Sequence, residues 1–151
     1  MASSTEPPTS ELLHVQNYWA NMRRNSPIYE FLLSDISLVS ASKGVVIATL
    51  NVKPCHLNSK GTLHGTVSAC LTDWAGGLAI ATHGREKTGV STDIHTTFIS
   101  TAKEGDVLEI QGRANKVGGT LAFTSVEIRK AGEDGASSVI STGSHTKYVK
   151  Q

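Results

Sequence analysis

The sequence predicts an α+β fold in which a curved antiparallel β-sheet of about six strands wraps around one long central helix. Three observations support this prediction. Residues 64–82 are apolar on nearly every side, which is typical of an enclosed helix. A strand–turn–strand pattern precedes this segment, and four segments of alternating polarity follow it. An antiparallel sheet has one face to cover, and the apolar helix is available to cover it.

Length and charge limit the classes of protein that need consideration. With 151 residues, the chain is expected to form one domain over residues 11–151, after a disordered leader at residues 1–10. The formal net charge is +1 and charges of both signs are interspersed, so nucleic acid is not an expected partner. The apolar stretches are too short to insert into a membrane. No signal-peptide or clear transit-peptide pattern is present, which favours a cytoplasmic protein, with the mitochondrion as an alternative.

The N-terminal part predicts two short helices. Thr9 or Ser10 can cap the first helix, and Ser26 with Pro27 is a typical start for the second. The first helix has an apolar stripe at helical spacing, formed by Leu12, Val15, Trp19 and Met22. In the second helix, the expected buried residues are Ile28, Phe31 and Leu32.

The remaining elements follow in a simple order. Residues 36–40 and 45–52 predict a hairpin around Ser42-Lys43-Gly44. The central helix contains Gly76-Gly77, which costs roughly 1 kcal/mol per glycine relative to alanine and therefore suggests close approach of another backbone. Four strands are expected at residues 89–100, 106–116, 120–130 and 138–149. In the first of them, strict alternation would place Val90, Ile94, Phe98, Thr92 and Thr96 on one face.

The start of the central helix carries the most informative polar residues. His64-Gly65 opens the helix, where free backbone N–H groups and the positive end of the helix dipole can hold a developing oxyanion. Asn58 precedes His64 by six residues and Asp73 follows it by nine. A carboxylate in so apolar a helix is costly without a role, so Asp73 is the preferred candidate for a general base.

Helix geometry places the two halves of this candidate site apart. Asp73 is eight residues past Gly65, which is roughly 12 Å along the axis at about 1.5 Å per residue. That separation is too large for one site within one chain. If Asp73 acts with His64 and Gly65, they are expected to come from different subunits, in a composite site at a two-fold interface.

Each candidate also has an alternative structural explanation. His64 can be a base or a group that orients its neighbours, and orientation is favoured. The amide of Asn58 can simply fix the loop before the helix. The strand position of Ser91 alone does not decide between a structural and a functional role for its side chain. Cys55-His56 is not expected to act as a nucleophile and base, because adjacent residues point to opposite sides of an extended chain.

Several separate motifs together resemble one known family. They are Asn58 with Gly61-Thr-Leu-His-Gly65, Leu71-Thr-Asp73, Gly89-Val-Ser91 with Asp93, Thr120-Leu-Ala-Phe-Thr-Ser-Val126, and His145-Thr-Lys147. The chain resembles the hotdog-fold thioesterases in these motifs, especially the branch of acyl-coenzyme A thioesterase 13 and the phenylacetyl-CoA-type thioesterases. The resemblance extends from about residue 35 to the C-terminus.

The resemblance implies hydrolysis of a medium- or long-chain fatty acyl-CoA to the free acid and coenzyme A. In it, Asn58, His64 and Gly65 surround the thioester carbonyl, Asp73 acts on water, and Ser91 helps to position that water. Coenzyme A is part of the substrate, and no cofactor and no metal is implied. Coenzyme A binding at subunit boundaries implies a homo-oligomer, a dimer or a dimer of dimers.

The resemblance also suggests substrate-binding residues, His145 among them, and two departures from the family. Coenzyme A phosphates need cations, for which Lys147 in the His145-containing motif is the best candidate and Lys116 a weaker one. Gly118-Gly119 could let the nucleotide approach the backbone, although the family commonly has a lysine there. Thr66 replaces a second glycine, next to the expected position of the acyl group.

Two rival functions remain from the sequence. A thioesterase of the same fold could release a carrier-bound polyketide or acyl product. A non-catalytic acyl-CoA-binding protein is the other rival, and the retained acid Asp73 argues against it.

Overall fold

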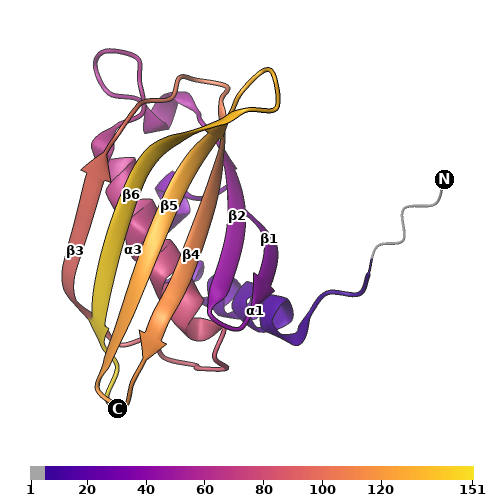
Figure 1. Ribbon diagram of the computed structural model, residues 1–151, viewed down its shortest axis with the longest axis vertical. Coiled ribbons are helices and arrows are strands. Elements are labelled where there is room, and N and C mark those ends of the chain that lie inside the picture. The colour runs from indigo at the N-terminus through magenta and orange to yellow at the C-terminus, as the bar shows by residue number, and fades with distance from the viewer. Residues whose placement is uncertain (1–5) are drawn as a thin grey trace.

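The computed structural model describes residues 6–151 of the chain and contains the expected sheet wrapped around a central helix (Figure 1). Residues 1–5 of the expected leader lie outside the described residues, and Ser10 already belongs to the first helix. The elements in chain order are α1 (Ser10–Arg24), α2 (Pro27–Leu32), β1 (Ser37–Ser42), β2 (Val45–Asn51), a short 3₁₀ turn η1 (Pro54–His56), α3 (Gly65–Ala81), β3 (Val90–Phe98), β4 (Val107–Val117), β5 (Leu121–Ala131) and β6 (Ser137–Tyr148).

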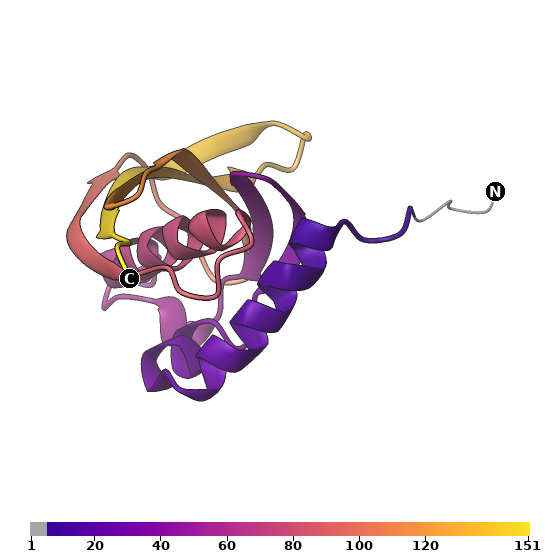
Figure 2. The ribbon, with the colours of Figure 1, turned by 90° about the horizontal axis from the view of Figure 1, so that it is seen from below.

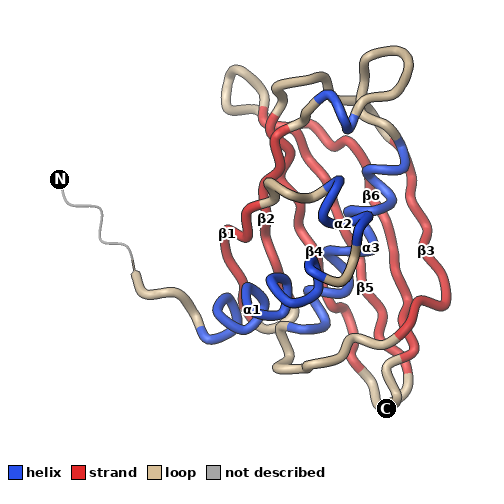
Figure 3. The backbone as a smooth tube through the Cα atoms, turned by 180° about the vertical axis from the view of Figure 1, so that it is seen from behind, coloured by secondary structure: helices blue, strands red, loops and turns tan. Residues whose placement is uncertain are grey.

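The six strands form one antiparallel sheet in the order β1-β2-β4-β5-β6-β3. The sheet curves around α3, as the view from below shows (Figure 2). The N-terminal helix α1 lies on the same side of the sheet, and it packs against β1 and α3 (Figure 3). This arrangement is the hotdog fold that the sequence predicts, and it leaves β3 at one edge of the sheet and β1 at the other.

The core lies between α3 and the concave face of the sheet. Leu71, Trp74 and Leu78 of α3 are fully buried, and they meet the inward side chains of the strands, including Ile110 and Ile128. The predicted alternation of β4 and β5 is confirmed, since their inward residues are buried. Full burial of each large apolar side chain contributes roughly 1.5–3 kcal/mol, which explains why α3 can be apolar nearly all round.

Gly76 of the glycine pair in α3 does allow a close approach, but by side chains of the sheet and not by the backbone that the sequence suggested. A Cβ atom on Gly77 would meet only ordinary contacts, at 3.7 Å from Nζ of Lys147 and Oγ1 of Thr88. A Cβ atom on Gly76 would lie 2.6 Å from Oγ1 of Thr124 on β5 and 3.0 Å from Nδ1 of His145 on β6. Only a residue without a side chain therefore allows β5 and β6 to come this close to the helix. The cost of glycine within the helix is offset by contact between α3 and the centre of the sheet.

The short helix α2 begins as expected but turns a different face inward. Ser26 caps it and Pro27 is its first residue, so its predicted start is confirmed. Ile28 and Phe31, which were expected to be buried, are each 65% exposed, and that prediction is wrong. The reason is that Tyr29 packs edge-on against Trp19 of α1, which fixes the rotation of this six-residue helix.

A bulge in β3 breaks the strict alternation that the sequence suggested. On β6, Lys147 and Thr146 are consecutive, whereas their partners on β3 are Ser91 and Asp93, so Thr92 is the extra residue. Ser91 thereby shares the face of buried Lys147, which is directed at α3. The expectation that Val90 shares a face with Ile94 is wrong, because the bulge reverses the phase of the strand between them.

Within residues 6–151, no helix is long and apolar enough to span a membrane.

Candidate active site

The first turn of α3 contains a backbone donor, the Gly65 N–H, that is not used within the turn. His64 is the N-cap residue, and its Nδ1 accepts a hydrogen bond from the Thr66 N–H at 3.0 Å. The Val67 N–H donates to the His64 carbonyl at 2.9 Å. In the part of the chain that the structure describes, no hydrogen bond is donated by the Gly65 N–H. This donor lies at the positive end of the α3 dipole, where a developing negative charge is stabilised.

The capping role of His64 also decides which of its nitrogens is protonated. Because Nδ1 accepts the Thr66 N–H, a neutral His64 carries its proton on Nε2. The side chain is therefore an orienting group at the helix start. Thr66 is exposed, so its side chain lies at the surface of a single chain.

Phe98 at the end of β3 packs over the start of α3. A Cβ atom on Gly65 would lie 3.1 Å from the Phe98 ring. The ring is itself largely exposed, and it forms an apolar wall beside the free Gly65 N–H. Glycine at this position therefore provides space as well as a backbone donor.

The side chain of Asn58 fixes the loop that leads into α3. Its Oδ1 accepts from the Lys60 N–H at 2.9 Å and the Thr62 N–H at 3.2 Å, and its Nδ2 is 3.0 Å from Oγ1 of Thr62. These contacts fix the amide and occupy one hydrogen of Nδ2 at most. The second hydrogen is available to a ligand, so the loop-fixing role and a binding role are compatible.

Asp73 lies in the middle of α3, next to groups from two other elements. Tyr29 of α2 donates its hydroxyl hydrogen to Oδ2, and Nε2 of His145 on β6 lies 3.5 Å from Oδ1. The side chain of Asp73 is 34% exposed, so water and substrate can reach it. The carboxylate is therefore held at Oδ2 by a hydrogen bond, while the side chain as a whole stays partly open to solvent.

His145 connects Asp73 with Ser91. Its side chain is fully buried, and Nε2 is 2.7 Å from Oγ of Ser91. Nδ1, which lies against Gly76, has no hydrogen-bond partner among the described residues. A proton on Nδ1 would be a buried donor without an acceptor, whereas a proton on Nε2 has Ser91 as its acceptor.

This proton assignment limits what Ser91 can do. Burial lowers the pKa of His145, with the nearby Asp73 carboxylate opposing the change, so the ring is neutral at pH 7. If Nε2 carries the proton, His145 donates to Ser91 and cannot take a proton from it. Ser91 is then an orienting hydroxyl rather than a nucleophile.

Lys147, expected at a phosphate site, is buried behind Asp73. Its Nζ donates to Oγ1 of Thr88 at 3.2 Å, and the Tyr18 hydroxyl is 3.0 Å from the same oxygen. Burial lowers the pKa of Lys147, and Asp73 opposes that change. In a single chain, this ammonium group contributes positive charge near Asp73 from within the protein.

The other expected phosphate contacts lie at the opposite end of α3 from Gly65. Lys116 is exposed on β4, and the Gly118 carbonyl accepts from Arg85 at 3.3 Å. Gly119 is exposed in the turn between β4 and β5. Since β5 begins beside Ile80 near the end of α3, these residues and Gly65 do not form one site within a chain.

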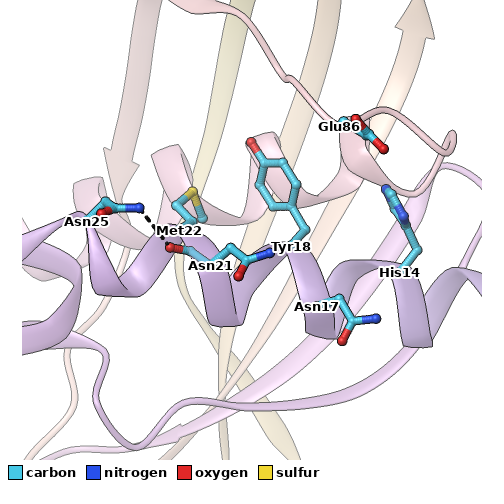
Figure 4. A pocket seen from close by; sticks show the side chains of 7 residues that line it. All are labelled: His14, Asn17, Tyr18, Asn21, Met22, Asn25 and Glu86. Carbon is cyan, nitrogen blue, oxygen red and sulfur yellow. Dashed lines mark hydrogen bonds between the residues drawn. The ribbon is translucent and has the colours of Figure 1, made fainter.

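A separate polar groove runs along α1 and has a volume of about 620 Å³. It is lined by Asn17 and Asn21 of α1, by the C-cap residue Asn25 and by Glu86 of the loop before β3 (Figure 4). None of the residues expected at the thioester lines this groove. The groove therefore lies outside the candidate active site.

The structure unites some of the predicted residues and separates others. Asp73 and Ser91 come together, and His145, predicted as a substrate contact, lies between them. Gly65, His64 and Asn58 form a second group around the start of α3. Sequence reasoning missed Tyr29, for which the only available signal was a tyrosine within a capped turn before the sheet.

The fold is that of the hotdog-fold thioesterases, and comparisons with known proteins assign the chain to the same class. The sequence matches the thioesterase superfamily over residues 60–137, and the chain belongs to this family. Human acyl-coenzyme A thioesterase 13 is 39% identical over 121 residues, which cover 80% of this chain and 84% of that protein.

Comparison with solved structures also shows similarity to thioesterases. Zebrafish thioesterase superfamily member 2 superposes with a TM-score of 0.80 at 34% identity and covers 91% of this chain and 96% of its own. A hypothetical thioesterase protein from Streptococcus pneumoniae, solved with coenzyme A, has a TM-score of 0.68 at 25% identity, covering 76% of this chain and 88% of its own.

Proposed function

We propose that this protein hydrolyses medium- or long-chain fatty acyl-CoA to the free fatty acid and coenzyme A. The observation that carries the proposal is the accessible carboxylate of Asp73 beside Ser91, in a chain that belongs to the thioesterase superfamily. The similarity to acyl-coenzyme A thioesterase 13 and to a thioesterase solved with coenzyme A supports the choice of acyl-CoA.

The start of α3 binds the electrophile. The Gly65 N–H and the remaining hydrogen of the Asn58 amide donate to the thioester oxygen as it becomes negative. A single such donor contributes roughly 3–4 kcal/mol to the transition state. His64 fixes this turn through the Thr66 N–H, and the Phe98 ring lies beside it.

Asp73 provides the nucleophile. Its Oδ1 accepts a proton from water while the water oxygen attacks the thioester carbon, and Ser91 positions that water. The tetrahedral intermediate collapses with cleavage of the C–S bond, and the proton goes to the departing thiolate of coenzyme A. Direct attack by the carboxylate, with hydrolysis of the resulting anhydride, is the other route that these groups allow.

The proposed site uses two subunits. Because about 12 Å of helix separates Asp73 from Gly65 at roughly 1.5 Å per residue, the Asp73 that completes the site belongs to a second copy of the chain. The exposed edge strand β3, with Ile94 and Phe98 exposed, supports pairing with another copy. The assembly is a dimer, and a dimer of dimers in its larger form.

The substrate class is tested by thiol release from acyl-CoA substrates of increasing chain length and from the matching acyl-carrier-protein thioesters. Preference for CoA substrates of medium or long chain supports the proposal. Preference for carrier-bound thioesters contradicts it in favour of product release in a biosynthetic pathway. Chelator treatment is expected to leave the rate unchanged, because the proposed chemistry uses no metal or other cofactor.

A further inference from the structure

Tyr29 of α2 contacts the carboxylate of Asp73 from outside α3. The Tyr29 hydroxyl donates to Oδ2 of Asp73, whereas Oδ1 is the oxygen that faces His145. The two carboxylate oxygens are thus distinguished by their surroundings. One is held by a neutral donor, and the other is free to accept a proton from water.

The hydroxyl of Tyr29 is a donor throughout the working pH range of the enzyme. Burial raises the pKa of Tyr29, and the adjacent Asp73 carboxylate raises it further. The phenol therefore stays protonated, and its hydrogen bond to the carboxylate is charge-assisted.

The surroundings of Tyr29 fix the position of this hydroxyl. The Trp19 ring lies between Tyr29 and Trp74, with edge-on contacts at centroid distances of 5.9 Å and 5.5 Å. Trp74 is the residue next to Asp73 on α3, so the aromatic stack joins Tyr29 to the same turn of the helix. The position of Tyr29 relative to Asp73 is therefore set by packing as well as by the hydrogen bond.

The end of α2 is attached to the start of α3 through one buried side chain. Nε2 of His56 donates to the Leu32 carbonyl at 2.7 Å, and Nδ1 accepts from the Lys53 N–H at 3.0 Å. The His56 carbonyl in turn accepts from the His64 N–H at 2.8 Å. The C-terminal end of α2 is thus fixed to the segment that leads into the candidate site.

We propose that Tyr29 is a positioning residue for the reaction, whose hydroxyl holds Oδ2 of Asp73 so that Oδ1 faces the attacking water. The inference rests on the proposed role of Asp73. It adds α2 to the parts of the chain that determine the rate. Without the hydroxyl, the carboxylate can rotate about its terminal torsion, which is broad for aspartate, and the base oxygen loses its fixed orientation.

The test compares Tyr29→Phe with wild type and with Tyr148→Phe in thiol release from an acyl-CoA. Tyr148 is a matched control, because it is an exposed tyrosine at the end of β6 that takes no part in the candidate site. Tyr29→Phe is expected to lower kcat about ten-fold and to leave KM within about two-fold, since one charge-assisted hydrogen bond is lost and the ring is retained. Tyr148→Phe is expected to keep the wild-type kcat.

A second measurement separates positioning from a general loss of structure. In an Asp73→Asn background, assayed at high enzyme concentration, Tyr29→Phe is expected to cause no further loss, because the carboxylate on which it acts is absent. Wild-type kcat in Tyr29→Phe, or an equal fractional loss in both backgrounds, overturns the inference. Absence of thiol release in wild type overturns the proposed function itself, which keeps the two failures distinct.

Discussion

The Ser91 hydroxyl on β3 lies 2.7 Å from Nε2 of His145 on β6, so two neighbouring strands place an orienting pair beside Asp73. The bulge at Thr92 turns Ser91 inward, and Gly76 makes room for the imidazole. The His145 ring has no competing partner at Nδ1 among residues 6–151. This relationship links a backbone irregularity and a helix glycine to the placement of the groups that we propose activate water.

Gly65 offers a direct test of the backbone donor. Gly65→Pro removes the N–H, and proline is tolerated at the first position of a helix. Loss of one oxyanion donor is expected to lower kcat about 10²- to 10³-fold. Gly65→Ala is the matched control, because it also adds a Cβ atom 3.1 Å from Phe98 but retains the N–H.

Steady-state thiol release and thermal unfolding of both variants check this prediction. Gly65→Ala is expected to remain within about ten-fold of wild type in kcat, because the donor is intact. Equal losses in the two variants would mean that crowding against Phe98, and not the missing N–H, causes the defect.

The two-subunit site predicts complementation between inactive variants. In a mixed dimer of Asp73→Asn and Gly65→Pro chains, one site receives both substitutions and the other receives neither. After equal mixing with random exchange, about one quarter of wild-type activity is expected, since half of the dimers are mixed and each has one intact site. Subunit exchange is verified with two affinity tags, and no recovery despite exchange argues for a site within one chain.

The buried imidazole of His145 predicts a stability that depends on pH. Its pKa in the folded protein lies below the ordinary value of 6.5 because of burial. Between these two values the unfolded chain binds more protons than the folded one, so the free energy of unfolding falls as the pH falls through this window. The slope is at most about 1.4 kcal/mol per pH unit for one group.

Urea unfolding of wild type and His145→Gln at pH 7.5 and pH 5 measures this effect. Glutamine is expected to destabilise the protein at pH 7.5 but to reduce the additional loss on acidification, because it does not titrate. An unchanged pH dependence in His145→Gln would assign the acid sensitivity to other groups.

Much of this fold can be predicted from the sequence because its signals are local. Thr9, Ser26 and His64 occupy N-cap positions, and the alternation of β4 and β5 matches their burial. Gly76 correctly indicated a close approach to α3, because a helix rarely accepts that cost without a packing reason.

The arrangement around Asp73 is harder to predict, because it depends on contacts between distant segments. The bulge at Thr92 exists only in the pairing of β3 with β6, and composition gives no sign of it. His145 was expected to contact substrate, but strand pattern alone could not reveal its proximity to Asp73. Tyr29 was missed because its inward orientation depends on Trp19.

The most direct test of the central claim is thiol release from a long-chain acyl-CoA by wild type and by Asp73→Asn. Asparagine keeps the shape of the side chain and can still accept the Tyr29 hydroxyl hydrogen, so the protein is expected to fold with an unchanged unfolding temperature. Wild type is expected to release coenzyme A with turnover, and Asp73→Asn is expected to lose at least about 10²-fold in kcat. Full activity in Asp73→Asn, or no thiol release by wild type, would contradict the account.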